Sequence, residues 1–349
     1  MKKHIDFLEI KNFKSIENLR FDCNKINVFI GEPNVGKSNI LEALSLFEIY
    51  DYETGSKIKG YSTKDILRFK DPKDLFYYQN IGNRIEVLND KDQLVIDTIH
   101  SNEKLFGELQ GGKDASYIVT INSNRKIRFT NDFDYSGTIL SANTELSNHY
   151  RRYDFSKKYF QINSANSYGT FLRFPFGENL LNILNIYPKL NDLISGLFES
   201  TGFEFVMNES DNSMNIQRRM TKSSVRTIPF IQIADTIQRI IFYFAAIHSN
   251  KESILIFEEP EVHSFPPYVV ALAQEILSSE TNQFFIATHS PYLLNEVIEK
   301  CPVEDVNIFV TYLQDYQTQV RLLTSEELSE LLNYGIDIFF NLANYAESK

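Results

Sequence analysis

Short apolar runs recur at three places in the chain, and each ends abruptly in polar residues. The runs are Ile26–Ile30, Ser253–Phe257 and Gln283–Ala287. Continuous apolar strands of this length are typical of a parallel sheet that is buried on both faces. Helical periodicity lies between or beside the runs, over Asn39–Phe47, Thr236–Ile247 and Pro267–Leu277. The two ends of the chain therefore predict a parallel α/β core.

The middle of the chain has shorter and less regular patterns. Residues 51–75 are rich in charge and contain Gly55 and Gly60, which predicts an exposed connection. Residues 81–129 alternate apolar and polar positions between turn signals such as Gly111-Gly112, which predicts an antiparallel sheet. Residues 141–175 have no clear period.

Further elements are predicted from local signals. Asn179–Phe198 has a helical period that Pro188 divides into two helices. Two hairpins are expected, one from Ile5–Ile10 and Leu19–Phe21 and another across residues 203–217. Near the C-terminus we expect two edge strands and a helix that opens with a Ser-x-x-Glu cap: Val306–Thr311, Val320–Leu323 and Ser325–Leu332.

These patterns predict a chain of two parts. Residues 1–50 and 226–349 would form a discontinuous head, and residues 51–225 would form an inserted arm of antiparallel sheet and helices. No internal repeat and no long heptad run is present, so a long coiled coil is not expected.

The loop after the first apolar run carries the strongest chemical signal. Gly31-Glu32-Pro33-Asn34-Val35-Gly36-Lys37-Ser38 fits the pattern G-x-x-x-x-G-K-[ST] of nucleoside triphosphatases. Its glycines let backbone N–H groups point into one concavity, and the following helix adds its positive N-terminal end. Lys37 would contact the β- and γ-phosphates, and Ser38 would supply an oxygen for Mg²⁺. The expected cofactors are ATP and Mg²⁺, and the expected nucleotide-binding residues are Gly31, Asn34, Val35, Gly36, Lys37, Ser38, Asn39 and, in the opening hairpin, Lys14.

The other two apolar runs also end in residues with a role in phosphate chemistry. Glu258 and Glu259 follow one run, and His289 follows the other. The carboxyl ends of parallel strands are where ligands bind in open α/β sheets. Glu258 would hold Mg²⁺, Glu259 would polarise the attacking water, and His289 would contact the γ-phosphate. Taken singly, a Glu-Glu pair fits a solvated loop and a lone histidine fits ordinary surface; the order of the three segments favours catalysis.

Composition narrows the function classes. The formal net charge of −11 is unfavourable for a protein that coats nucleic acid, although it leaves room for a local basic groove. Cys23 and Cys301 lack zinc-type spacing and indicate a reducing compartment. The first residues do not read as a signal peptide, and the most apolar run is too short for a bilayer. We therefore expect a cytoplasmic protein.

Two basic runs are candidates for nucleic-acid contact. One interleaves cations with aromatic rings over Tyr150-Arg151-Arg152-Tyr153 and Lys157-Lys158-Tyr159-Phe160. The other contains Arg218, Arg219, Lys222 and Arg226. The alternative is ordinary solvated surface or a protein-binding patch, and the net charge favours that alternative.

The order of these motifs resembles the ABC-type ATPase heads of the SMC and RecF group. Within that group, the segments Glu258-Glu259-Pro260-Glu261 and Ala287-Thr288-His289-Ser290 are most similar to bacterial AAA-family ATPases related to the OLD (overcoming lysogenization defect) proteins. The opening segment from Leu8 to Ser15 also looks like the first hairpin of these heads. The resemblance covers residues 1–50 and 226–349 and leaves the middle uncovered.

Two departures from the family pattern bear on activity. Glu258 stands where most relatives have Asp. Relatives open the helix before the acidic strand with Ser-x-Gly, whereas this chain reads Ala234-Asp235-Thr236-Ile237-Gln238-Arg239. Thr236 and Arg239 remain as polar contacts at a helix N-terminus; alternatively, Asp235 is only a cap and Arg239 a surface charge. The degenerate signature predicts slow hydrolysis.

The resemblance implies an ATPase that forms a nucleotide-dependent homodimer or higher oligomer, because in such heads the signature of one subunit closes over the phosphate loop of the other. It also implies a role in a bacterial anti-phage, or abortive-infection, system. OLD-type relatives often carry a C-terminal TOPRIM nuclease domain, for which the 60 residues after His289 are too few. A separate effector protein is therefore expected as a partner. The alternative is a RecF-like repair ATPase that binds DNA directly; a structural organiser and a transporter ATPase are disfavoured.

Overall fold

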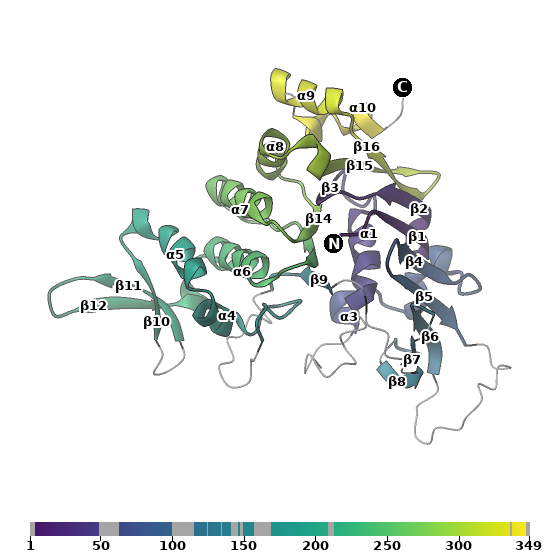
Figure 1. Ribbon diagram of the computed structural model, residues 1–349, viewed down its shortest axis with the longest axis horizontal. Helices are drawn as coiled ribbons and strands as arrows, with labels where there is room; N and C mark the ends of the chain where they lie inside the picture. The colour runs from purple at the N-terminus through teal and green to yellow at the C-terminus, as the bar shows by residue number, and fades with distance from the viewer. Residues whose placement is uncertain are drawn as a thin grey trace.

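The computed structural model describes residues 4–48, 63–99, 115–123, 125–133, 135–140, 146, 149–156, 169–208, 213–335 and 337–346. Within these ranges the strands form three sheets (Figure 1). The central sheet runs in the order β16 (Gln317–Leu322), β15 (Val306–Gln314), β3 (Ile26–Ile30), β14 (Gln283–Ala287), β13 (Ser253–Glu258) and β9 (His149–Tyr153). Neighbours are parallel except β15 and β16, which are antiparallel. The expected mixed sheet is thus present, but β15 lies inside it and is not an edge strand.

The three apolar runs form central strands of the sheet, and a hydrophobic core covers each of their two faces. Along β14, Phe284 and Ile286 join one hydrophobic core, while Phe285 and Ala287 join the other. This division follows the two-residue period of a strand. A strand between two cores needs mostly apolar side chains, and in β14 only Gln283, at its first position, is polar.

Helices cover both faces of the central sheet (Figure 1). On one face, α1 (Lys37–Ser45) lies between the central sheet and the second sheet. The other face is covered by α6 (Asp235–Ser249), α7 (Pro266–Ser278) and α8 (Pro291–Lys300), which pack side by side. The C-terminal helices α9 (Ser325–Tyr334) and α10 (Leu342–Ala346) pack near α8 and β15. The cap of α9 is a box formed by Thr324 and Glu327, one residue earlier than expected.

The second sheet crosses the boundary that the sequence suggested between head and arm. Its order is β2 (Ile16–Asp22), β1 (Phe7–Phe13), β4 (Ile85–Asn89), β5 (Gln93–Thr98), β6 (Ala115–Ile121), β7 (Arg125–Thr130) and β8 (Tyr135–Leu140). The expected antiparallel sheet is therefore present, and β4 pairs with β1 of the opening hairpin. The turn of that hairpin is shorter than expected, because β1 and β2 extend to Phe13 and Ile16. The division at residues 51 and 225 stays a prediction, and Gly111-Gly112 lies outside the described residues.

Two segments without a predicted structure pack into the core. Residues 149–153 form β9, the edge strand beside β13, so the Tyr150–Tyr153 run is neither solvated surface nor a binding patch. Tyr150 stacks on Phe47 with ring centroids 4.5 Å apart. The described part of the expected exposed connection also folds back, through α3 (Thr63–Ile66) and a short 3₁₀ helix (Pro72–Leu75) with Leu67 and Leu75 buried. The second half of the first basic run, residues 157–160, lies outside the described residues.

A third sheet projects away from the core beyond two helices (Figure 1). It consists of β10 (Glu204–Asn208), β11 (Ser213–Arg219) and β12 (Val225–Pro229), all antiparallel. The two helices are α4 (Leu180–Ile186) and α5 (Pro188–Gly196), which divide at Pro188 as predicted. The hairpin of β10 and β11 confirms the expectation for residues 203–217, and β12 is an addition. Among the helices of the described ranges, none combines the length and apolar character needed to cross a membrane.

Candidate nucleotide site

Three polar segments meet at one edge of the central sheet because their strands are adjacent and parallel. Ala287 of β14 pairs with Phe29 of β3 on one side and with Glu258 of β13 on the other. The loop after β3, the Glu258-Glu259 pair and His289 therefore leave the sheet together. They line a cleft of about 810 Å³ with Lys14, Asn34, Gly36, Lys37, Ser38, Asn39 and Arg68. The predicted side chains of different strands thus share one cleft, whereas Gly31 and Val35 do not line it.

The loop holds the lysine amine close to its own backbone. Lys37 Nζ donates to the carbonyl oxygens of Gly31 and Glu32, both at 2.8 Å. Burial lowers the pKa of Lys37 to about 8, against the opposing pull of Glu259 and Glu258. Gly36, with φ of 100°, precedes the first residue of α1. A side chain is strained at this φ, which explains the glycine.

The phosphate loop is supported from the far end of the chain. Thr318 Oγ1 on β16 donates to the Val35 carbonyl at 2.9 Å and lies 2.6 Å from Ser15 Oγ. Asn39 Nδ2 donates to the same Ser15 oxygen at 2.6 Å. A Cβ at Gly36 would lie only 1.9 Å from Thr318 Oγ1. The second glycine of the motif is thus required by close packing as well as by backbone conformation.

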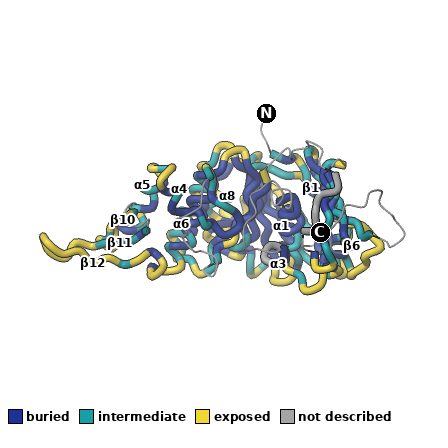
Figure 2. The backbone as a smooth tube through the Cα atoms, turned by 90° about the horizontal axis from the view of Figure 1, so that it is seen from below, coloured by how far each residue is buried: buried dark blue, intermediate teal, exposed yellow. Residues whose placement is uncertain are grey.

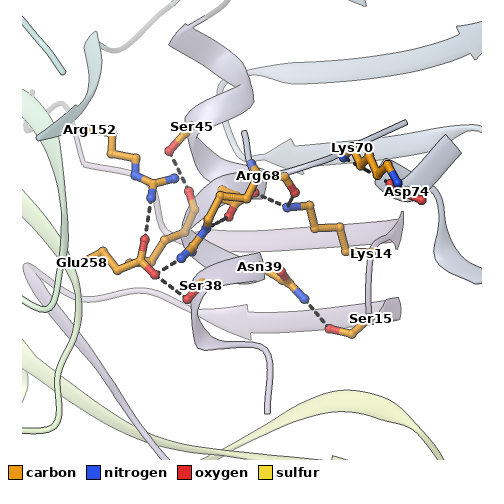
Figure 3. A network of polar contacts seen from close by, with 12 residues as sticks. Lys14, Ser15, Ser38, Asn39, Ser45, Arg68, Lys70, Asp74, Arg152 and Glu258 are labelled. Atoms are coloured by element: carbon orange, nitrogen blue, oxygen red, sulfur yellow. Dashed lines mark hydrogen bonds and ion pairs between the residues drawn. The ribbon is translucent and has the colours of Figure 1, made fainter. Parts of the chain in front are cut away.

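Glu258 is the centre of a polar network (Figure 3). One carboxylate oxygen, Oε1, accepts hydrogen bonds from Ser38 Oγ and, at 2.6 Å, from Arg68 Nη2. The other, Oε2, accepts from Arg152 Nη2. Burial opposes ionisation of Glu258, but Arg152 and Arg68 outweigh it and hold its pKa below the usual range. The carboxylate is therefore charged and has its oxygen beside the hydroxyl of Ser38, as a Mg²⁺ site of hard oxygen ligands requires.

The network continues through Glu42 on α1. Glu42 Oε1 accepts from Arg68 Nε at 2.7 Å, and Oε2 accepts from Lys14 Nζ. Lys14 also donates to the Arg68 carbonyl at 2.8 Å. Burial lowers the pKa of Lys14 while Glu42 opposes that shift. Lys14 thus lines the cleft as expected, and its amine is engaged with the network in this structure.

Glu259 and His289 lie next to each other in the cleft. His289 Nε2 lies 3.6 Å from Glu259 Oε1. Burial and the charge of Lys37 lower the pKa of His289, while Glu259 opposes them. The backbone at Glu259 has a φ of 44°, which turns the chain sharply after the strand and separates the direction of Glu259 from that of Glu258.

A third carboxylate positions the histidine. Glu261 Oε1 accepts from Thr288 Oγ1 at 2.6 Å and from the backbone N–H of His289 at 2.8 Å. Burial raises the pKa of Glu261 despite these hydrogen bonds. The contact joins the turns that follow β13 and β14, so it fixes the two catalytic candidates relative to each other.

The signature-like residues lie at the N-terminus of α6 and do not line the cleft of their own chain. The helix begins at Asp235, and Ala234, not Asp235, is its cap residue. Thr236 Oγ1 donates to the His263 carbonyl. The Arg239 guanidinium stacks over the Phe155 ring at 4.9 Å and is half-buried, so it is not simply a surface charge.

Sequence reasoning missed several members of the site. The sequence pattern predicts an exposed connection around Arg68, and for Arg152 it predicts nucleic-acid contact or solvated surface. Thr318 and Glu261 received no role. Only Glu261 has a local signal, since it follows Glu258 and Glu259 in the same turn. The others reach the site from segments that no local pattern connects to it.

Comparisons with known proteins agree with this geometry. Residues 26–295 match the model of a family described as an AAA domain, putative AbiEii toxin, Type IV TA system. The chain belongs to this family. The match includes the phosphate loop, the acidic strand and His289, which line most of the cleft, whereas Lys14 lies outside the matched residues.

Two curated relatives are similar to this AAA-domain chain. Endonuclease GajA of Bacillus cereus (strain VD045) is 22% identical over 335 residues, which cover 83% of this chain and 56% of GajA. Protein ea59 of Escherichia phage lambda is 33% identical over 96 residues, which cover 25% of this chain and 18% of ea59. The chain thus spans just over half the length of GajA and a smaller share of ea59.

Solved structures of SMC heads share the fold. The crystal structure of the SmcHead bound to the C-winged helix domain of ScpA has a TM-score of 0.52 at 18% identity, with 94% of this chain and 99% of that chain covered. The Smc head domain with an extended coiled coil, derived from Pyrococcus furiosus, has a TM-score of 0.50 at 15% identity, with 95% and 99% covered. The expected ABC-type P-loop ATPase head related to OLD proteins is confirmed.

Proposed function

We propose that this protein binds and hydrolyses ATP with Mg²⁺. The observation that carries the proposal is the meeting of Lys37, Glu258-Glu259 and His289 in one cleft at the ends of three adjacent parallel strands. Backbone N–H groups and a helix N-terminus supply an anion nest there. Family membership supports an ATPase, and the site supports the roles of individual residues.

Each residue has a task that its position favours. Lys37 would exchange the carbonyls of Gly31 and Glu32 for phosphate oxygens. Ser38 and Glu258 would hold Mg²⁺, which neutralises phosphate charge when bound. Glu259 would accept the proton of the attacking water, and His289 would donate to the γ-phosphate from its place beside Glu259. Glu261 would keep His289 in that place through its backbone N–H.

The two arginines that pair with Glu258 differ in how easily they can move away from its carboxylate. Arg152 is 4% exposed at its side chain and Arg68 is 58% exposed. Arg68 and Ser38 share Oε1 of Glu258, the oxygen that would face Mg²⁺. We infer that Arg68 moves off Glu258 when Mg²⁺ and nucleotide bind, while Arg152 stays.

The test of ATP hydrolysis is phosphate release by the parent protein and by Glu259→Gln with Mg²⁺ and ATP. The substitution keeps the shape but removes the proton acceptor, so the rate is expected to fall by about two orders of magnitude or more. Hydrolysis at the parent rate by Glu259→Gln would reject the assigned base. If ATP binds but neither protein releases phosphate, the protein is an ATP-binding switch.

At the level of the cell, the proposal is an ATPase component of bacterial anti-phage defence that acts as a nucleotide-dependent dimer or higher oligomer with a separate effector. The similarity to OLD-related ATPases supports it, and the place of Asp235, Thr236 and Arg239 outside their own cleft is compatible with contact to another subunit. A pull-down from the native host tests the partner. Recovery of a nuclease or toxin would support the proposal, and recovery of recombination proteins alone would reject it in favour of a RecF-like repair ATPase.

A further inference from the structure

The two basic runs of the sequence have opposite surroundings in the structure. Arg151 and Arg152 are buried in β9. By contrast, residues 218–227 are all exposed, and they form the end of the hairpin β11–β12. This hairpin, residues 213–229, contains Arg218, Arg219, Lys222 and Arg226 and no carboxylate, whereas the whole chain has a net charge of −11. Positive charge is therefore concentrated on one element.

The arrangement of the cations in the hairpin destabilises the folded state. Arg218 is directly opposite Arg226 in the antiparallel register, and like charges in this position repel each other. No carboxylate of the described residues forms an ion pair with either arginine, with Arg219 or with Lys222. Cations that would bind an anion repel one another while the anion is absent, so a functional site of this kind costs stability in the free protein.

The hairpin is also accessible from several sides. It projects from the core beyond α4 and α5 (Figure 1), and its end is exposed at the tip of the molecule (Figure 2). Strand β12 is the edge of its sheet. Because successive residues of a strand face opposite sides, Arg219 lies on the other face from Arg218. Lys222 lies in the turn, where Thr221 and Ser224 hydroxyls are 2.7 Å apart.

From this geometry we propose that the hairpin β11–β12 binds the phosphate backbone of duplex nucleic acid. A two-stranded β-ribbon fits the major groove of B-DNA, whose two walls are lined with phosphates. Cations on both faces and hydroxyl groups at the turn suit contact with both walls. The binding is independent of the ATP site and is expected to show little dependence on base sequence.

The residue types of the hairpin disfavour other occupants. Residues 213–229 contain no aromatic side chain. Protein interfaces usually depend on buried aromatic anchors, and single strands are held by stacking of bases on aromatic rings. A ribbon with four cations and no rings is suited to a charged backbone whose bases stay paired.

The experiment measures the anisotropy of a labelled mixed-sequence duplex with the full chain, from about 50 to about 200 mM salt. The hairpin variant is Arg218→Ala with Arg226→Ala. The matched control is Lys251→Ala with Lys300→Ala, two exposed lysines of the head, which lowers the net charge equally. We expect the parent and control to bind alike and the hairpin variant to bind at least about tenfold more weakly. The slope of log affinity against log salt should fall by about 2 in the hairpin variant, because about one counterion is released per phosphate contact.

Thermal melting checks the fold of each variant, and the hairpin variant should melt no lower than the parent because it loses a repulsive pair. Three results would overturn the proposal: no duplex binding by the parent at the lowest salt, equal binding by hairpin variant and control, or tighter binding of the same strand unpaired. Capture of an acidic protein that requires Arg218 and Arg226, without duplex binding, would also overturn it and assign the hairpin to a protein partner.

Discussion

At the residue scale, Lys37 is buried where its charged form is destabilised in the absence of a bound anion. Burial lowers its pKa to about 8, and two backbone carbonyls are its hydrogen-bond partners. Lys37→Ala removes a charge-assisted contact to phosphate worth roughly 1.5–3 kcal/mol, so ATP affinity should fall at least about tenfold. Calorimetric titration measures this, with Lys300→Ala as a control for lost charge. Unchanged affinity would show that the loop does not bind phosphate.

The two arginines at Glu258 lead to a prediction about stability. Removing one partner of a buried ion pair costs about 3–5 kcal/mol, whereas exposed pairs contribute about 0–1 kcal/mol. Arg152→Gln should therefore lower the free energy of unfolding by several times more than Arg68→Gln. Urea unfolding of both variants measures the difference. Equal losses would mean that Arg152 is not the fixed partner of Glu258.

Glu261 provides a prediction about pH. Its pKa is raised in the folded protein above the ordinary value of 4.5, so between these two values the folded state binds more protons than the unfolded state. The contribution of Glu261 to stability is thus present at low pH and is lost as pH rises through its folded pKa. Glu261→Gln keeps an acceptor for Thr288 and His289 and removes this loss. The stability of Glu261→Gln relative to the parent should therefore increase as the pH rises from 4.5 to neutrality. Denaturant unfolding at both pH values tests it, with exposed Glu299→Gln as the control that should show no such trend.

At the scale of elements, the phosphate loop depends on β16, which is nearly three hundred residues away along the chain. Thr318 is fully buried and joins Val35 to Ser15. Thr318→Val keeps the shape but leaves these polar groups without a partner, at a cost of about 1–3 kcal/mol in stability. ATP affinity should fall as well, because the loop loses its support. Thr318→Ser keeps the hydroxyl and should restore both quantities; if Thr318→Val binds ATP like the parent, the loop is held by its own backbone alone.

At the scale of the whole molecule, the proposed dimer can be captured by stopping hydrolysis. Glu259→Gln leaves the phosphate nest and Lys37 intact, so it should bind ATP and accumulate as an ATP-bound dimer or higher oligomer. Light scattering with ATP and Mg²⁺ measures the mass. Glu258→Gln should fail to accumulate, because a weakened Mg²⁺ site releases nucleotide. If the two variants exchange these results, the roles of the two carboxylates are reversed; a monomeric mass for both would argue against nucleotide-dependent assembly.

The sequence by itself determined the features that are encoded in continuous segments. Eight consecutive residues specify the phosphate loop, and three apolar runs specify the central strands with Glu258, Glu259 and His289 at their ends. The hairpin of β10 and β11 and the break at Pro188 follow from local propensity as well. Such features are readable because each depends on the conformation of neighbours in the chain.

Only the tertiary structure decided which distant residues complete the site. The sequence around Arg152 is typical of a solvated run because arginines are rarely buried, yet Glu258 on the adjacent strand compensates its charge in the interior. Arg68 and Thr318 reach the loop from segments with no motif of their own. The same structure left Arg218 and Arg226 exposed on a projecting hairpin. An arginine can be buried or exposed, and the residues that the fold places beside it decide which of the two occurs.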